Sequence, residues 1–407
     1  MGRIGDASFE IPMSNRFEFL RRELAALEVS DSLRRLRRWP DPDGRGGGGG
    51  EGELISFASN DYLGLAAERW AGSDACPRGA GASPLVSGYT ELHDRLCRML
   101  AQWEQAEAAV VLPSGYAACC GVVATLPRAG DLILSDRWNH ASLIDGCRLS
   151  KAEKRVYPHA DLAAVEATLI RHRHEFEQVW IVTDGVFGMD GDIAPLEGLC
   201  DLADRHDAIM VVDEAHGSGV LGEDGSGACE DRGVRERVPI RIGTLSKAVG
   251  SQGGFVVGPQ TVIDYLVNFC RPLIFSTAAS PLVIATAIDG IRAIREEPWR
   301  RQRVRELARR VRGHLSLVDK GDSSGCVPII PIILGSNHRA VHVAKQARQA
   351  GLFIPAIRPP TVPAGTARLR ISLSATHRAD HIDRLLRFLN GLPEVRQAAS
   401  GNGQQPF

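Results

Sequence analysis

Short apolar runs recur through the middle of the chain, and each is followed directly by a turn of small and polar residues. Their lengths of three to five residues suit buried strands, and helical segments separate most of them. Strands joined by helices form a largely parallel sheet with both faces covered, so we predict the α/β class. Such a sheet binds its ligands at the carboxyl ends of its strands. The runs are residues 108–112, 132–134, 179–183, 209–212, 239–242 and 255–257.

Composition divides the rest of the chain. Residues 14–38 repeat leucine near helical spacing, which predicts an amphipathic helix that residues 29–31 could interrupt. Residues 40–52 are rich in glycine, proline and aspartate, which predicts a flexible linker. Beyond residue 290 the pattern changes to that of a smaller α+β domain. The predicted organisation is a helical arm with its linker at 1–52, a large domain at 53–290, a small C-terminal domain at 291–397 and a disordered tail at 398–407.

The overall composition is typical of a globular protein in a reducing compartment. Apolar residues make up 44% and charged residues 24%, and the formal net charge of -1 provides no basic surface for nucleic acid. The nine cysteines include no Cys-x-x-Cys pair, which favours reduced thiols over disulfides or a zinc site, and we interpret Cys119 and Cys120 as helix packing residues. No apolar run is long enough to span a bilayer, and residues 1–6 lack the apolar stretch of a signal peptide. We therefore predict a cytoplasmic protein without a membrane partner.

Lys247 stands among small residues between two of the apolar runs. A lysine buried there is poorly hydrated, which disfavours its ammonium form and lets the amine attack an aldehyde. The alternative is a surface lysine on a connecting loop. Asp213 ends a buried strand and His216 follows three residues later, so the pair is either two metal ligands or a carboxylate facing a protonated ring nitrogen. A pyridinium cofactor bound through a lysine requires the second arrangement.

Three further segments contain residues suited to a ligand. Ser114–Tyr116 joins a strand to a helix, whose N-terminus offers unpaired N–H groups to an anion. His140 follows another strand, where it is either a packed loop residue or a ring stacked on a flat ligand. Residues 79–89 are rich in glycine and serine, which allows a ligand or another subunit to approach the backbone closely.

Several segments together resemble one known family. They are Asn60–Gly64, Val86–Tyr89, Asn139–Ser142, Asp213–Gly217 and Gly243–Lys247. They are similar to motifs of the α-oxoamine synthases, pyridoxal-phosphate (PLP) enzymes of fold type I, and the resemblance extends from about Asp31 to Leu392. Residues 357–373 resemble the branch of this family that joins L-alanine to a pimeloyl thioester. The resemblance implies a mostly parallel central sheet with a smaller C-terminal α+β domain, PLP as cofactor and no metal.

The resemblance also implies a role for individual residues. Lys247 is implied to bind the cofactor aldehyde and to act as acid and base, Asp213 to pair with the pyridine nitrogen, and His216 with the phenolic oxygen. His140 is implied to stack on the ring. The other implied cofactor contacts are Gly115, Tyr116 and Thr244. The implied substrate contacts are Arg34, Asn60, His140, Thr361 and Arg370, of which Arg370 binds the amino acid carboxylate.

The implied reaction is a decarboxylative condensation by a homodimer with its active site at the interface. The acyl carrier is either CoA or an acyl carrier protein. The alternatives are a sister enzyme with another amino acid or acyl chain, and a non-catalytic partner subunit of the same fold. Two positions depart from the family's pattern, because Gly188 stands where serine is usual and Asp184 where glutamate is common. Because Gly188 has no hydroxyl, one contact to the cofactor is missing. We therefore expect either weaker cofactor binding or a water molecule in place of the hydroxyl.

Overall fold

The computed structural model describes residues 16–36, 54–68, 76–315, 327–393 and 395. The linker predicted at 40–52 and the tail predicted at 398–407 lie outside these residues. The chain separates into two compact units, a smaller one of residues 1–55 and 332–370 and a larger one of residues 56–331 and 371–407. The domain boundaries expected from the sequence, after residues 52 and 290, stay a prediction.

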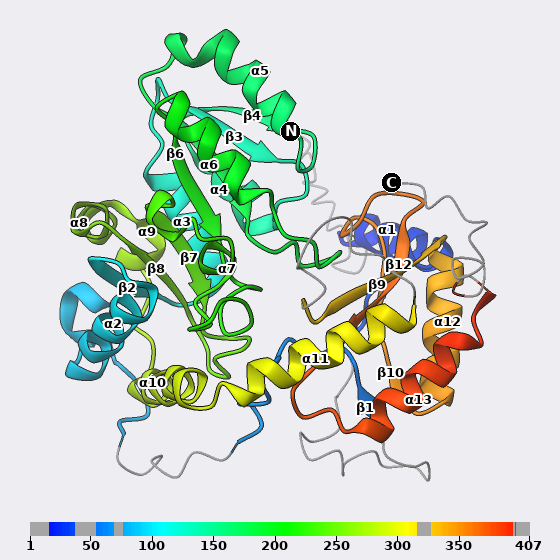
Figure 1. Ribbon diagram of the computed structural model, residues 1–407. Helices are drawn as coiled ribbons and strands as arrows, with labels where there is room; N and C mark the ends of the chain where they lie inside the picture. Colours follow the sequence, from blue (N-terminus) through cyan, green and yellow to red (C-terminus); the bar gives the residue numbers. More distant parts are fainter. Residues whose placement is uncertain (1–15, 37–53, 69–75, 316–326, 394, 396–407) are drawn as a thin grey trace, which may run out of the picture. The chain divides into compact units, whose positions relative to one another are not determined.

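A seven-stranded sheet forms the centre of the larger unit, with the order β2-β8-β7-β6-β5-β3-β4 (Figure 1). Neighbouring strands pair in parallel except at β8, which runs antiparallel to both β2 and β7. The predicted α/β class with a mostly parallel sheet is therefore confirmed. The strands are β2 Ala108–Leu112, β3 Leu132–Asp136, β4 Glu153–Tyr157, β5 Val179–Asp184, β6 Ile209–Asp213, β7 Ile240–Thr244 and β8 Gly254–Gly258.

Both faces of this sheet are covered. Every residue of β3, β5, β7 and β8 is buried, as expected for strands that read as continuous apolar runs. One face shares a hydrophobic core with α3 (Gly115–Thr125), a mostly apolar helix whose buried residues are Ala118, Cys119, Gly121, Val122 and Val123. The helix begins at Ser114, whose hydroxyl accepts the N–H of Ala117 at 3.1 Å. The start of α3 therefore lies directly after the carboxyl end of β2.

The larger unit contains further helices besides α3. In the described part of the chain, no helix is both long and apolar enough to cross a membrane. The eight cysteines outside position 326 are all free in the structure. The helices are α2 Glu91–Glu104, α4 Ala141–Leu149, α5 Leu162–His172, α6 Leu196–Arg205, α7 Ala228–Asp231, α8 Gln260–Phe269, α9 Arg271–Ile274, α10 Pro281–Glu296, α11 Trp299–His314 and α13 Ala379–Asn390.

Short strands and two helices make up the described part of the smaller unit. A three-stranded sheet has the order β11-β12-β9, and a two-stranded sheet pairs β1 with β10. Strand β11 runs antiparallel to β12, with Ala356 opposite Leu369. The elements, some of which extend by a few residues beyond this unit, are α1 Glu18–Val29, β1 Ile55–Ser56, β9 Ile329–Gly335, α12 Asn337–Gln349, β10 Leu352–Phe353, β11 Ala356–Ile357 and β12 Ala367–Ser372.

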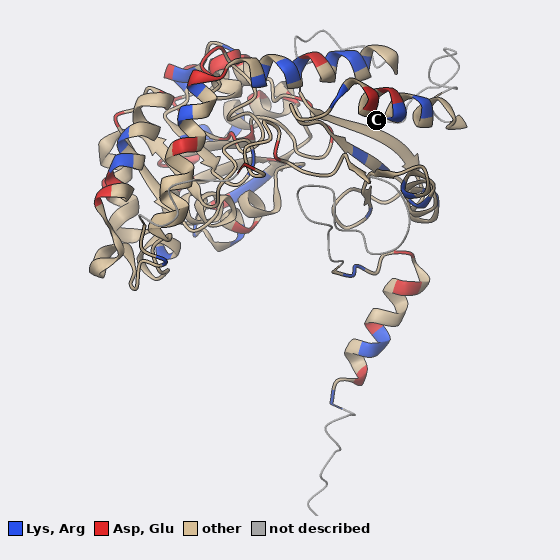
Figure 2. Cartoon of the chain, turned by 90° about the horizontal axis from the view of Figure 1, so that it is seen from below, with Lys and Arg blue, Asp and Glu red and all other residues tan. Residues whose placement is uncertain are grey.

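Helix α1 is shorter than the sequence predicts. The N–H groups of Ser32 and Leu33 both bond to the carbonyl of Leu27, at 2.8 and 3.0 Å, and these bonds close the last turn. Asp31 has a positive φ of 52°, which a continuing helix does not allow. The interruption expected at residues 29–31 is therefore confirmed, and the chain does not return to a helix over residues 32–36. Acidic and basic residues are mixed along α1, and none of its residues is buried (Figure 2).

Candidate functional site

The carboxyl ends of β5, β6 and β7 lie next to one another in the larger unit, because the three strands are parallel neighbours. Strand β5 ends at Asp184 and β6 at Asp213, and these two residues are directly opposite in the register. Strand β7 ends at Thr244, three residues before Lys247. The sheet topology thus brings together polar residues that are far apart in the sequence, at the edge where open α/β sheets bind ligands.

A line of hydrogen bonds connects Lys247 to the turn after β1. Lys247 Nζ lies 3.0 Å from Nε2 of His216, and Nδ1 of the same ring lies 2.7 Å from the hydroxyl of Tyr62. The Tyr62 hydroxyl also donates to Oδ1 of Asn60 at 3.2 Å. If the amine donates to Nε2, the imidazole carries its proton on Nδ1 and donates it to Tyr62. Three residues that the sequence singled out, Asn60, His216 and Lys247, are therefore joined through a buried tyrosine.

Two buried carboxylates, those of Asp213 and Asp184, occupy the same strand ends. Asp213 is 4% exposed and Asp184 5%. Burial raises the pKa of Asp184 well above its usual value, and the charge of Asp213 raises it further, while the N–H of His140 lowers it through a bond of 2.8 Å. Neighbouring carboxylates in a dry site are costly unless a cation or hydrogen-bond donors balance them. A protonated pyridine nitrogen is such a cation, so this pair fits the cofactor that the sequence resemblance implies.

His140 forms the N-cap of α4 beside these carboxylates. Its Nδ1 lies 2.7 Å from the hydroxyl of Ser142. Burial lowers the pKa of His140, Asp213 raises it and Lys247 lowers it, so the charges of both residues act on the ring. The ring of Tyr116 meets that of His140 edge-on, with 6.3 Å between the centroids. His140 is thus placed with the residues at the carboxyl ends of β5, β6 and β7, as the sequence predicts.

The start of α3 packs closely against the end of β7. A Cβ added at Gly115 would lie 3.0 Å from both Cβ and Oγ1 of Thr244, so a larger residue there would crowd the threonine. Oγ1 of Thr244 also lies 2.7 Å from Oγ of Ser246. The first N–H groups of an eleven-residue helix and two hydroxyls therefore gather in one place. That combination suits the phosphate of PLP.

Gly188 lies against the imidazole of His216. A Cβ added at Gly188 would come within 2.5 Å of Nε2, closer than real Cβ contacts. Its φ is not in the left-handed region, so the backbone alone does not require glycine here. The lack of a side chain at position 188 therefore leaves room for His216.

One partly buried histidine, His159, escaped the sequence analysis. Its Nδ1 lies 3.0 Å from Asp136 and its Nε2 2.8 Å from Asp192, and its ring stacks on Trp138 with 4.0 Å between the centroids. Burial by itself lowers the pKa of His159, but the hydrogen bonds and charges of the two carboxylates raise it to about 9. The imidazolium links the end of β3, and with it the turn that leads to His140, to the loop after β5. No local pattern in the sequence marks this bridge.

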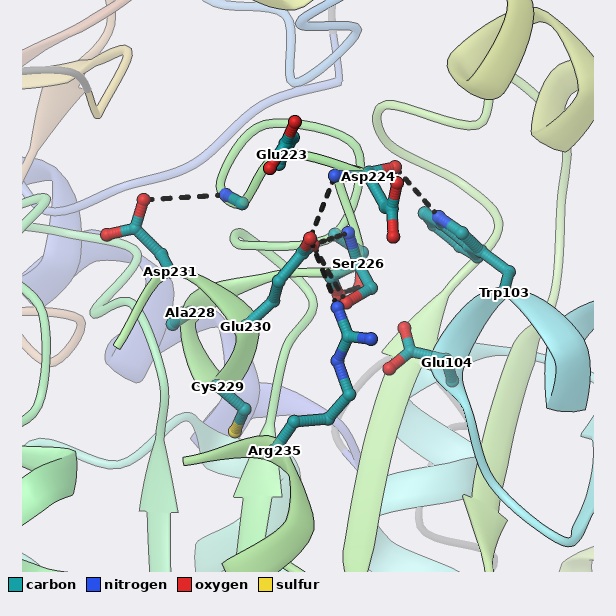
Figure 3. A network of polar contacts seen from close by, with 12 residues as sticks. Trp103, Glu104, Glu223, Asp224, Ser226, Ala228, Cys229, Glu230, Asp231 and Arg235 are labelled. Atoms are coloured by element: carbon teal, nitrogen blue, oxygen red, sulfur yellow. Dashed lines mark hydrogen bonds and ion pairs between the residues drawn. The ribbon is translucent and has the colours of Figure 1, made fainter. Parts of the chain in front are cut away.

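Two carboxylates hold the loop that follows His216. Glu214 accepts two backbone N–H groups at the start of α7, at 2.6 and 2.7 Å. Glu230 accepts the N–H of Ser226 at 2.8 Å and pairs with Arg235 at 3.1 Å (Figure 3). Among the described residues, no group of three or more His, Cys, Asp or Glu side chains could hold a metal ion. These carboxylates thus bind backbone and arginine.

The remaining predicted site residues belong to the smaller unit. Arg34 donates to Oγ1 of Thr361 at 3.3 Å, so the two residues expected to meet the acyl substrate are in contact. Arg358 donates to the carbonyl of Asp31, which holds the chain after α1 against the same segment. Arg370 lies on β12 and is 5% exposed. Arg34, Arg358 and Arg370 therefore belong to a different unit from the residues at the strand ends described above.

Comparison with known proteins identifies a family and relatives that match most of the chain. Residues 52–389 match the family model described as aminotransferase class I and II. The chain is 42% identical to the 8-amino-7-oxononanoate synthase of Lysinibacillus sphaericus, over 92% of this chain and 97% of the relative. It is 45% identical to the 8-amino-7-oxononanoate synthase of Bordetella petrii, over 90% and 96%.

Solved structures show the same fold. A serine palmitoyltransferase from S. paucimobilis, solved with a bound PLP-myriocin aldimine, superimposes with a TM-score of 0.83 at 28% identity, covering 96% of this chain and 100% of the other. The 8-amino-7-oxononanoate synthase of Francisella tularensis superimposes with a TM-score of 0.70 at 25% identity, covering 86% and 98%. A solved structure with this fold therefore contains bound PLP.

Proposed function

Because this chain belongs to the class I and II aminotransferase family, and within it to the 8-amino-7-oxononanoate synthases, we propose that it condenses L-alanine with a pimeloyl thioester. The chain is a PLP-dependent acyltransferase of the biotin pathway, and the predicted family and cofactor are confirmed. In the proposed reaction a bond forms between the α-carbon of alanine and the acyl carbon. The thioester bond and the bond to the alanine carboxylate break. The products are 8-amino-7-oxononanoate, CO2 and the free thiol of the carrier.

The observation that supports this proposal most directly is the placement of Asp213, His216 and Lys247 at neighbouring strand ends. Bound PLP supplies an electron sink that stabilises negative charge on the α-carbon of the amino acid. Asp213 would hold the pyridine nitrogen in its protonated form, and His216 would meet the phenolic oxygen. Gly115, Tyr116 and Thr244 would hold the phosphate end at the start of α3. His140 would cover one face of the ring.

Lys247 is the proposed acid and base. Its Nζ would bind the cofactor aldehyde before alanine arrives, and would then take the proton from the α-carbon. The contact of Nζ with His216, and of His216 with Tyr62, holds the amine at one point of the site. After CO2 has left, Lys247 would return a proton to the same carbon, and Nζ would displace the product nitrogen from the cofactor aldehyde carbon to release the amino ketone.

Three of the five proposed substrate contacts, Arg34, Thr361 and Arg370, come from the smaller unit. Arg370 is buried and would bind the alanine carboxylate with two parallel N–H bonds. Arg34 and Thr361, which are 3.3 Å apart, would meet the acyl substrate. The acyl carrier is either CoA or an acyl carrier protein.

We also propose that the protein works as a homodimer. In the larger unit, Leu85, Val86 and Phe275 expose 54, 78 and 70% of their surfaces, and η3 (Pro84–Gly88) contacts α9. An exposed group of large apolar residues on neighbouring segments is typical of a protein interface. A second copy of the chain is the proposed occupant, with the active site near the interface.

The function is tested by analysing the products of the purified protein with alanine and pimeloyl-CoA. Alanine should give 8-amino-7-oxononanoate and one equivalent of CO2, and Lys247→Ala should give neither. Serine with palmitoyl-CoA tests the sister activity, which the structural similarity to serine palmitoyltransferase suggests. Preference for serine or glycine over alanine would reject the proposed substrates. If no amino acid is consumed by PLP-loaded protein, the chain is a non-catalytic subunit.

A further inference from the structure

Cys119 is a buried thiol that contacts the carboxylate of Asp213. The residue lies in the first half of α3 and is 2% exposed. Its Sγ donates a hydrogen bond to Oδ2 of Asp213 at 3.1 Å, and the other carboxylate oxygen accepts the N–H of Ala215 at 2.8 Å. Asp213 is thus held from two sides, by a side chain of α3 and by the backbone after β6.

The thiol is a hydrogen-bond donor and not a second anion. Burial raises the pKa of Cys119 well above its usual value, and the charge of Asp213 raises it further. The sulfur therefore keeps its proton at neutral pH. A carboxylate oxygen has two lone pairs and a thiol is a weak donor, so Oδ2 remains able to accept a further N–H. Two donors on one carboxylate nevertheless fix its plane.

We propose that Cys119 is a positioning residue that orients the Asp213 carboxylate toward the pyridine nitrogen of PLP. The inference rests on the role proposed above for Asp213, and it replaces the earlier interpretation of Cys119 as a packing residue alone. An aspartate held only by the backbone would be free to rotate about its Cβ–Cγ bond. Binding of PLP would then have to order this carboxylate, and the entropy lost in doing so would lower the affinity of the protein for PLP.

Cys120 offers a matched control on the same helix. It is the next residue, it is also a cysteine, and it is only half-buried. Consecutive positions on a helix point about 100° apart, so its side chain faces away from that of Cys119. Replacing Cys120 removes a thiol from α3 and leaves the Asp213 contact in place.

The contact itself can be observed without activity. In the infrared spectrum of the PLP-free protein, the S–H stretching band of Cys119 should lie at lower frequency than those of cysteines without a carboxylate partner. Cys119→Ala should remove that band, Asp213→Asn should shift it, and Cys120→Ala should leave it unchanged. A Cys119 band that does not respond to Asp213→Asn would overturn the inference.

The effect on the cofactor is measured as the PLP dissociation constant, from tryptophan fluorescence. We expect Cys119→Ala to raise it roughly three- to tenfold, the usual worth of one hydrogen bond. Cys119→Ser, which keeps a donor of similar size, should restore most of the affinity, and Cys120→Ala should not change it. If Cys119→Ala does not fold, the PLP affinity of Cys119→Ser and the response of the infrared band to Asp213→Asn still test the positioning role.

The inference and the proposed role of Asp213 can fail separately. If Asp213→Asn binds PLP as tightly as the unmodified protein, Asp213 does not pair with the cofactor and the assigned site is wrong. If Asp213→Asn weakens PLP binding but Cys119→Ala matches Cys120→Ala, only the positioning role is rejected. An unchanged affinity in all three variants rejects both.

Discussion

Gly188 lies so close to His216 that a Cβ at position 188 would come within 2.5 Å of the Nε2 atom of the imidazole. The same nitrogen lies 3.0 Å from Lys247 Nζ, and Tyr62 holds the opposite side of the ring. The ring therefore cannot move away from a new side chain without breaking one of these contacts. The relationship gives a steric reason for glycine that the sequence could not show.

Gly188→Ser and Gly188→Ala should both weaken PLP binding, because each adds a Cβ against His216. If the serine hydroxyl also bonds to the cofactor, the serine variant should bind PLP more tightly than the alanine variant by roughly 0.5–1.5 kcal/mol. The measurement is the PLP dissociation constant of all three proteins, with melting temperatures as a control. Serine that binds PLP more tightly than glycine would show that the missing hydroxyl matters more than the crowding.

Lys247 should carry the cofactor. The purified protein should be yellow, and borohydride reduction should link PLP covalently to Lys247, which peptide mapping can distinguish from the four other lysines of the chain. Lys247→Arg should remove the covalent adduct and keep a positive charge at the site. An adduct on Lys151, Lys154 or any other lysine would remove the basis of the proposed mechanism.

Arg370→Ala should raise KM for alanine much more than KM for the acyl donor. A substrate carboxylate that loses a bidentate partner loses on the order of 2–4 kcal/mol of binding free energy. Arg368 is the control, because it lies on the same face of β12 and is also buried. Steady-state kinetics on both variants should show the alanine effect only for Arg370→Ala. Equal effects of the two changes would point to a general loss of structure.

His159 should make stability depend on pH. Its folded-state pKa of about 9 lies above the ordinary value of 6.5, so its contribution is fully present below pH 6.5 and is lost as the pH rises through 9. The free energy of unfolding in urea should differ between the unmodified protein and His159→Gln at pH 6, and this difference should shrink toward pH 10. A difference that stays constant over this range would mean that His159 is not protonated in the folded protein.

The sequence predicted where three of the candidate site residues lie, because each comes at or shortly after the end of an apolar run. Asp213, Lys247 and His140 each come within a few residues of a strand end, and parallel strands bring their carboxyl ends to one edge of the sheet. The apolar runs also predicted six of the seven strands of the central sheet. The interruption expected at residues 29–31 is where α1 ends, at the positive φ of Asp31.

Only the tertiary structure decided which side chains touch. Cys119 and Asp213 are 94 positions apart, and His159 and Asp192 are 33 apart, and no spacing rule connects either pair. Periodicity predicts which residues of one strand or helix share a face. These contacts instead depend on the order of strands in the sheet and on the packing of α3 against it. Gly188 is a further example. The sequence showed only that a serine hydroxyl is missing at this position, whereas the structure shows that a side chain there would collide with His216.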